Sequence, residues 1–305
     1  MAITAAMVKQ LREKTGAGMM DCKNALSEVD GNMDEAIELL RKKGVMKAEK
    51  KADRIAAEGL CDCLIDGSTA AVVEVNSETD FVAKNDDFKQ FVSSVAKQAL
   101  ATSASDIDSF LADKWNEDST KTVKEALTDK VAVIGENLSI RRFEKVVASD
   151  GEILVSYIHG GGRIAVLLKA KADDNDGVRE ALSNIAMQVA AMNPKFISES
   201  DIDEGYRAHE EEILRAQIEN DPKESQKPDK VKEGMIKGRI NKQMKEVCLM
   251  DQVYVKAEDG KQSVQAYLKS VGDISIETMI RFETGEGIEK KEEDFAAEVA
   301  AQIAG

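Results

Sequence analysis

Side chains suited to covalent or metal chemistry are scarce in this sequence of 305 residues. It contains two histidines and four cysteines, of which Cys61 and Cys63 stand one residue apart. A zinc site of the usual spacing needs a second ligand pair, and neither cysteines nor histidines lie near these two. The G-x-S-x-G, H-E-x-x-H, Walker lysine and G-x-G-x-x-G motifs are also missing. We therefore expect no metal, no cofactor and no catalytic acid–base pair, and cysteines that are small buried apolar residues.

The segment that precedes Phe88 suggests binding chemistry instead. Only 4% of the chain is aromatic, yet Phe81 and Val82 lie between a predicted strand and a predicted helix, outside the apolar face that begins at Phe88. Connecting loops are where binding residues concentrate. On pattern alone a second interpretation stays open, in which Phe81 packs under its own helix and Asp80 or Asn85 only caps that helix.

The charge balance excludes some partners. The chain carries 57 acidic and 42 basic side chains, a formal net charge of −15. Such a surplus argues against general binding to a phosphate backbone. No apolar run is long enough for a membrane span, and the first residues lack the basic and apolar regions of a signal peptide. We expect a cytoplasmic protein that does not bind nucleic acid or a membrane directly.

Residues 1–55 are predicted to form three short helices and a lysine-rich linker or helix tail. Thr4 and Asn32 can cap the first and third helices, Asp21 is expected to open the second, and Gly44 to end the third. Each helix offers only a few apolar side chains for burial. Such a unit is expected to act as a docking module.

Residues 56–144 and 145–283 repeat one plan, a β-hairpin followed by helical structure and a closing strand. The first hairpin turns at Asp66-Gly67, where positive φ angles are needed, and the second at Gly160-Gly-Gly162. The predicted elements are strands at about 60–65, 70–75, 139–144, 153–158, 164–169 and 278–283, and helices at about 88–99, 107–111, 123–134 and 178–189. We therefore predict an α+β fold with a duplicated antiparallel sheet-plus-helix core.

The second copy contains an insertion of about 45 residues, at about 195–246. All three prolines of the chain border or lie within it. Its two arms show helical spacing of the residues Tyr206, His209, Ile213, Ala216 and Asn220, then Val231, Met235, Ile236, Ile240 and Met244. The pattern predicts an antiparallel helical hairpin with a thin apolar seam, projecting from the body. His209 is expected to be packed or hydrogen-bonded in that seam.

Residues 284–305 are predicted to be a C-terminal helical module. A helix from Glu289 to Ile303 would place Phe295, Val299 and Ile303 on one face. That face is expected to pack on a neighbour.

Two long strings resemble the signature stretches of the translation elongation factor Ts family. They are Leu11-Arg-Glu-Lys-Thr-Gly-Ala-Gly-Met-Met-Asp-Cys-Lys-Asn-Ala-Leu26 and Glu74-Val-Asn-Ser-Glu-Thr-Asp-Phe-Val-Ala-Lys84. Further stretches that resemble sequences of this family are Ile134-Gly-Glu-Asn137, Tyr157-Ile-His-Gly160, Ile280-Arg-Phe282 and Gly285-Glu-Gly-Ile-Glu-Lys290. The resemblance covers essentially the whole chain. It implies that the three-helix unit is ubiquitin-associated-like.

The resemblance also implies a guanine nucleotide exchange factor that releases GDP from elongation factor Tu without covalent chemistry. Asp80 and Phe81 would disturb the partner's magnesium site, with Phe81 separating two partner helices. His159 would help to displace the phosphate-binding loop. The residues implied to contact the partner are Arg12, Met19, Met20, Thr79, Asp80, Phe81, Val82, His159 and Gly160.

Three alternatives stay open at this level. Met19 and Met20 could belong to the core of the helical unit rather than to a contact surface. The ubiquitin-associated-like unit could be a non-catalytic protein-binding module that only tethers a partner. The assembly could include a homodimer of the core or a 2:2 complex.

Overall fold

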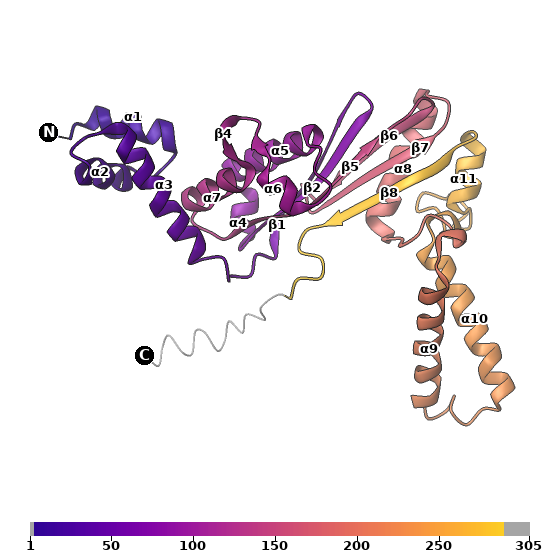
Figure 1. Cartoon of the computed structure of the whole chain (residues 1–305). Coiled ribbons are helices and arrows are strands. Elements are labelled where there is room, and N and C mark those ends of the chain that lie inside the picture. The colour runs from indigo at the N-terminus through magenta and orange to yellow at the C-terminus, as the bar shows by residue number, and fades with distance from the viewer. Residues whose placement is uncertain (1–2, 290–305) are drawn as a thin grey trace.

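The computed structural model describes residues 3–289 and has the predicted α+β class. In Figure 1 the chain runs from a helical N-terminal unit, through two three-stranded sheets, to a helical hairpin that projects from the region of the second sheet. The predicted helix from Glu289 to Ile303 lies outside the described residues beyond its first position. Across residues 3–289, no helix combines the length and the apolar character that a membrane span requires.

The N-terminal unit contains α1 (Ala5–Thr15), α2 (Met19–Glu28) and α3 (Met33–Glu49). The predicted caps are confirmed, because the Thr4 side chain accepts from the amide of Met7 and Asn32 accepts from the first amides of α3. The predicted opening of the second helix at Asp21 is wrong, since α2 begins two residues earlier, after Gly18. The small core of the unit consists of Val8, Leu11, Cys22, Ala25, Leu26 and Ala36.

The prediction that Gly44 ends the third helix is also wrong. The helix α3 continues through a buried Gly44 and packs on α7 (Val123–Ile134). A Cβ atom at Gly44 would lie 3.2 Å from the Cβ of Ala132, so the glycine permits a close approach of two helices instead of stopping one. An ion pair between Arg41 and Glu125 reinforces the contact. One continuous helix therefore belongs both to the N-terminal unit and to the body.

The first sheet has the antiparallel order β1-β2-β5, with β1 (Glu58–Asp66), β2 (Thr69–Ser77) and β5 (Leu138–Val147). Asp66 still pairs with Thr69, and of the predicted Asp-Gly turn only Gly67 has a positive φ. The helix α5 (Asp86–Ala101) covers one face of the sheet, with α6 (Ile107–Ala112) and α7 beside it. A small ribbon of β3 (Lys114–Trp115) and β4 (Asp118–Thr122) was not predicted.

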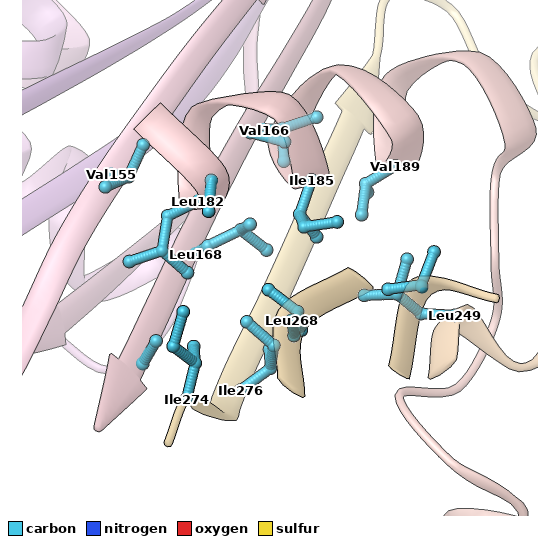
Figure 2. Packing of buried hydrophobic residues seen from close by; sticks show 14 of the residues in the cluster. Val155, Val166, Leu168, Leu182, Ile185, Val189, Leu249, Leu268, Ile274 and Ile276 are labelled. Carbon is cyan, nitrogen blue, oxygen red and sulfur yellow. The ribbon is translucent and has the colours of Figure 1, made fainter. Parts of the chain in front are cut away.

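The second sheet has the matching antiparallel order β6-β7-β8, with β6 (Glu152–His159), β7 (Ile164–Lys171) and β8 (Ser275–Glu283). The helix α8 (Asp176–Met192) lies across it, and Figure 2 shows Leu182, Ile185 and Val189 of this helix facing side chains of the sheet. The helix α11 (Val264–Val271) and the short turn η2 (Leu249–Asp251) complete this side. These two elements and the short turn η1 (Glu199–Asp201) were not predicted.

The remaining faces of the two sheets pack on each other. Their shared cluster consists of Cys61, Cys63, Ala70, Val72, Leu154, Ala165, Leu167 and Phe282. Many of these side chains are small, which allows two sheets to approach closely. The result is four layers in the order helix, sheet, sheet, helix. All four cysteines are buried, as predicted.

A buried ionic cluster fastens the two halves together. The Glu74 carboxylate of β2 is fully buried and accepts from Arg141 at 3.0 Å, from Arg142 at 2.5 Å and from the amide of Gly285 at 2.8 Å. The Arg142 guanidinium also lies over the ring of Phe282, 4.2 Å from its centre. The segment that follows the second sheet is therefore held by charges of the first sheet.

The inserted hairpin contains α9 (Glu204–Asn220) and α10 (Asp229–Val247), and it projects from the body in Figure 1. On α10 the predicted seam residues Ile236, Ile240 and Met244 are buried and Met235 is half-buried, whereas Val231 is exposed and its predicted place in the seam is wrong. On α9 the predicted face is wrong, because Leu214 and Ile218 are buried whereas His209, Ile213, Ala216 and Asn220 are exposed. Both stripes keep helical spacing with Tyr206, and the stripe with the larger apolar side chains is the one that packs.

Candidate functional site

The segment predicted as a loop is a short helix, α4 (Asp80–Lys84). Thr79 begins it, since its hydroxyl accepts from the amide of Val82 at 3.3 Å. Asn85 then ends α4 and caps α5, its side chain accepting from the amide of Asp87 at 2.8 Å. The ring of Phe81 is 80% exposed, so the interpretation that it packs under its own helix is wrong. The loop prediction failed because two good caps, Thr79 and Asn85, enclose a single turn that contains no glycine or proline.

One carboxylate holds the base of α4. Glu136, between α7 and β5, accepts from the amides of Glu78 at 3.1 Å and Thr79 at 3.0 Å, and from the Thr79 hydroxyl at 2.6 Å. Hydrogen bonds to a charged acceptor are among the stronger ones in proteins. The sequence analysis did not identify Glu136 as a functional residue, although Glu136 lies in the stretch Ile134-Gly-Glu-Asn137 that resembles the family sequence. Phe81 therefore projects from a fixed base.

Of the predicted contact residues on α4, two face solvent and two support the helix. Val82 is half-buried and packs against the core of the first sheet, and Thr79 is the cap. Asp80 is exposed and accepts from Lys84 at 2.6 Å. That hydrogen bond is the main reason why the pKa of Asp80 lies below its ordinary value. The surface of α4 thus presents an apolar ring beside an ionised carboxylate.

The predicted contact residues of the N-terminal unit are all exposed. Met19 and Met20, at the start of α2, are 61% and 64% exposed, and Arg12 on α1 is exposed as well. The alternative that the two methionines form the core is wrong, because Cys22 and Leu26 of the same helix occupy that position. Exposed methionines are flexible and polarisable, which suits contact with a partner surface.

His159 and Gly160 lie where β6 ends. His159 is exposed, and its Nδ1 lies 3.0 Å from the hydroxyl of Tyr157. The turn that follows is held against β1, because the carbonyl of Gly162 accepts from the amide of Cys61 at 2.7 Å. Gly162 has a φ of +104°, a conformation that side-chain-bearing residues rarely adopt, so this turn favours glycine.

The structure brings some of these residues together and leaves others apart. The turn after His159 bonds to β1, and α4 contacts the same strand, whose first residue Glu58 pairs with Ser77 just before α4. The helices α1 and α2, which carry Arg12, Met19 and Met20, lie at one end of the molecule in Figure 1. The predicted residues therefore form a series of separate contacts and not one pocket.

The side chains that could hold a metal ion or act as a nucleophile are few in this part of the molecule. Within residues 3–289, no three histidine, cysteine or acidic side chains are grouped so that they could hold a metal ion. Burial raises the pKa of both Cys61 and Cys63 to about 12, so these thiols are poor nucleophiles at neutral pH. What remains exposed and well supported is the ring of Phe81.

Comparisons with known proteins agree with the motifs. A family model described as elongation factor TS matches residues 78–286. The chain is 52% identical over 307 residues to elongation factor Ts of Clostridioides difficile (strain 630), with 99% of each chain covered. It is 48% identical, with the same coverage, to elongation factor Ts of Clostridium novyi (strain NT) and to that of Clostridium kluyveri.

Proposed function

The chain belongs to the elongation factor Ts family, and on that premise we propose that it promotes GDP release from elongation factor Tu by placing α4 at the partner's nucleotide site. Family members are nucleotide exchange factors in translation elongation. The chain is accordingly an exchange factor and not a catalytic enzyme.

The exposed ring of Phe81 on a fixed base is the observation that supports this proposal most strongly. A large apolar side chain that is 80% exposed gains by burial in a partner. Because Glu136 holds the base of α4 through three hydrogen bonds, the ring can displace partner helices without being displaced itself. Phe81 acts as a wedge between two helices of the GTPase.

Asp80 supplies the electrostatic part of the proposal. Its carboxylate is ionised and exposed beside Phe81. Mg²⁺ requires near-ideal octahedral geometry, so a small shift of its surroundings weakens its hold on the phosphates. Asp80 and Phe81 together disturb the partner's magnesium site, while Thr79 and Val82 keep α4 in place.

Phe81 cannot account for a large acceleration alone. Full burial of one phenylalanine contributes about 1.5–3 kcal/mol, and each tenfold acceleration requires about 1.4 kcal/mol. The ring therefore accounts for about tenfold to a hundredfold. The rest comes from a broad interface that includes Arg12, Met19 and Met20, with His159 and Gly160 acting on the phosphate-binding loop. At equilibrium the exchange factor lowers the affinity of the GTPase for GDP, and linkage requires that GDP lowers the affinity for the exchange factor by the same factor.

The domain organisation is part of the proposal. It comprises a ubiquitin-associated-like unit and linker (1–55), two core repeats (56–144 and 145–283) with the hairpin at about 195–246, and a C-terminal module (284–305). The matching strand orders of the two sheets support the duplication. Binding to the GTPase, without direct contact to nucleic acid or membrane, assigns the protein to the cytoplasm. The proposed assembly with the GTPase includes either a homodimer of the core or a 2:2 complex.

Release of a fluorescent GDP from elongation factor Tu, measured by stopped flow with and without the full chain, tests the proposal. We expect the release rate to rise with the concentration of the chain until it saturates. The alternative is a non-catalytic binding module that only tethers the GTPase. A tether would co-purify with elongation factor Tu but leave the release rate unchanged, and that result would overturn the exchange function.

A further inference from the structure

The strand β6 places two polar aromatic rings in sequence on one face. Residues at every second position of a strand share a face, so Ile153, Val155, Tyr157 and His159 point to the same side of the sheet. The first two belong to the core beneath α8, and Tyr157 is half-buried against that core. His159 stands beyond it at the open end of the strand and is exposed. Tyr157 is therefore the last fixed side chain before His159.

The two rings are joined by one hydrogen bond. The Tyr157 hydroxyl lies 3.0 Å from Nδ1 of His159, and the ring centres are 5.9 Å apart. Across residues 3–289 the hydroxyl of Tyr157 makes no other hydrogen bond. The same part of the chain shows no further partner for the imidazole of His159. Each ring thus determines what the other can offer to a partner.

The direction of this bond decides the chemistry of His159. A neutral imidazole carries one ring hydrogen, so a nitrogen that accepts a hydrogen bond leaves the hydrogen on the other nitrogen. The phenol is a stronger acid than a neutral imidazole N–H and is the better donor of the two. The Tyr157 hydroxyl accordingly donates to Nδ1, and the ring hydrogen of His159 lies on Nε2, on the side away from the core.

We propose that Tyr157 is a positioning residue for exchange, which holds His159 as the Nε2–H tautomer so that this N–H donates to a carbonyl or carboxylate oxygen of the GTPase. The inference rests on the proposed function, because it assumes that His159 meets the partner. To the proposed function it adds the orientation and the hydrogen-bonding role of the His159 ring. An oxygen in the partner loop that bonds to His159 is drawn away from its position in the GDP-bound state.

The variant Tyr157→Phe removes the hydroxyl and keeps the packing of the ring. We expect it to slow GDP release about fivefold, the ratio that corresponds to about 1 kcal/mol for one hydrogen bond. In a His159→Ala background the same change has no further effect, because the residue that it positions is gone. Tyr206→Phe is the matched control, since this tyrosine lies on the hairpin with its hydroxyl near Lys195, and it leaves the rate unchanged.

A second measurement reads the tautomer directly and does not involve the GTPase. The chain has only two histidines, so a His209→Gln background leaves His159 as the single imidazole in the full-length protein. Long-range ¹H–¹⁵N correlation spectra should show the hydrogen on Nε2. Tyr157→Phe should shift the ring towards a mixture of both tautomers.

The outcomes separate the inference from the proposed function. The positioning role is overturned if Tyr157→Phe leaves the tautomer and the release rate unchanged, or if it slows release equally in the His159→Ala background. It is also overturned if His159→Ala releases GDP at the wild-type rate while Phe81→Ala is slow, a result that leaves the wedge intact. Failure of the wild-type chain to accelerate release would instead overturn the proposed function itself.

Discussion

The two sheet units of this protein follow one plan but differ in the connection between the second strand and the covering helix. In the second unit, β7 leads to α8 through residues 172–175, and Asn175 simply caps the helix. In the first unit, the equivalent connection, residues 78–85, contains α4 and the exposed Phe81. The strands and covering helices provide the scaffold in both units. The difference teaches that an exposed helical turn with an aromatic side chain can be added to one unit of a repeated plan while the strand order of its sheet is kept.

The cluster that joins the two units is where we expect the largest effect. Glu74→Ala removes a fully buried carboxylate that accepts hydrogen bonds from both Arg141 and Arg142. Breaking a buried ion pair costs about 3–5 kcal/mol, and the partial exposure of both arginines reduces the expected loss to about 3 kcal/mol. Urea denaturation monitored by circular dichroism measures the loss. Glu144→Ala on the neighbouring strand, an exposed position, should stay within about 0.5 kcal/mol of wild type. Equal effects of the two variants would show that the cluster does not fasten the units.

Phe81→Ala tests the functional difference between the units. It should slow GDP release by about tenfold to a hundredfold, because the lost burial in the partner amounts to about 1.5–3 kcal/mol. Since Phe81 is exposed, the thermal unfolding midpoint should not change. The control is Met192→Ala, which removes an exposed apolar side chain at the end of α8 in the second unit. Release of GDP at the wild-type rate with Phe81→Ala would show that Phe81 does not act as a wedge.

Glu136→Ala asks whether the base of α4 must be fixed. The change removes three hydrogen bonds, and we expect release to slow about fivefold to tenfold although Phe81 is still present. Lys84→Ala is the matched control on the same helix, because it breaks only an exposed ion pair with Asp80. Hydrogen exchange of the α4 amides should increase in the Glu136 variant. If hydrogen exchange of the α4 amides increases but the rate of GDP release does not change, a rigid base of α4 is not required for release.

Removal of the hairpin should have the smallest effect on exchange. The chain enters and leaves the hairpin at adjacent positions, since the amide of Phe196 donates to the carbonyl of Val247 at 3.1 Å. Replacing residues 199–245 with a short glycine–serine linker should therefore leave both sheets folded. We expect a release rate within about threefold of wild type, equivalent to less than about 1 kcal/mol. A larger loss would place part of the interface on the hairpin, and fewer subunits per particle in solution would identify the hairpin as an oligomer contact.

Much of the fold could be predicted because apolar spacing and caps act locally. The helix predicted at 123–134 coincides with α7, and the caps Thr4 and Asn32 act as expected. Gly44 shows the limit of such reasoning. A glycine within a helical pattern is typical of a helix end, but here the close contact with Ala132 outweighs that tendency, and a contact between distant segments has no local signal.

The candidate site divides in the same way. The motif strings pointed to Phe81 and His159, and their exposure agrees with a contact role. The groups that hold them were not predicted, because Glu136 is distant in sequence from α4 and the bond between Tyr157 and His159 depends on geometry at the end of a strand. A stripe on α9 was assigned to the wrong face for a related reason, since two faces of that helix have helical spacing and only the partner helix selects between them.

The continuity of α3 gives the molecule a mechanical connection. This helix carries part of the N-terminal core and, further along, packs on α7, whose last turn ends at Gly135, directly before Glu136. Glu136 in turn holds the base of α4. In the proposed complex, a displacement of α2 by the partner at Met19 and Met20 is passed along α3 and α7 to Glu136 and the base of α4. The N-terminal unit and Phe81 are the two ends of one lever in that complex.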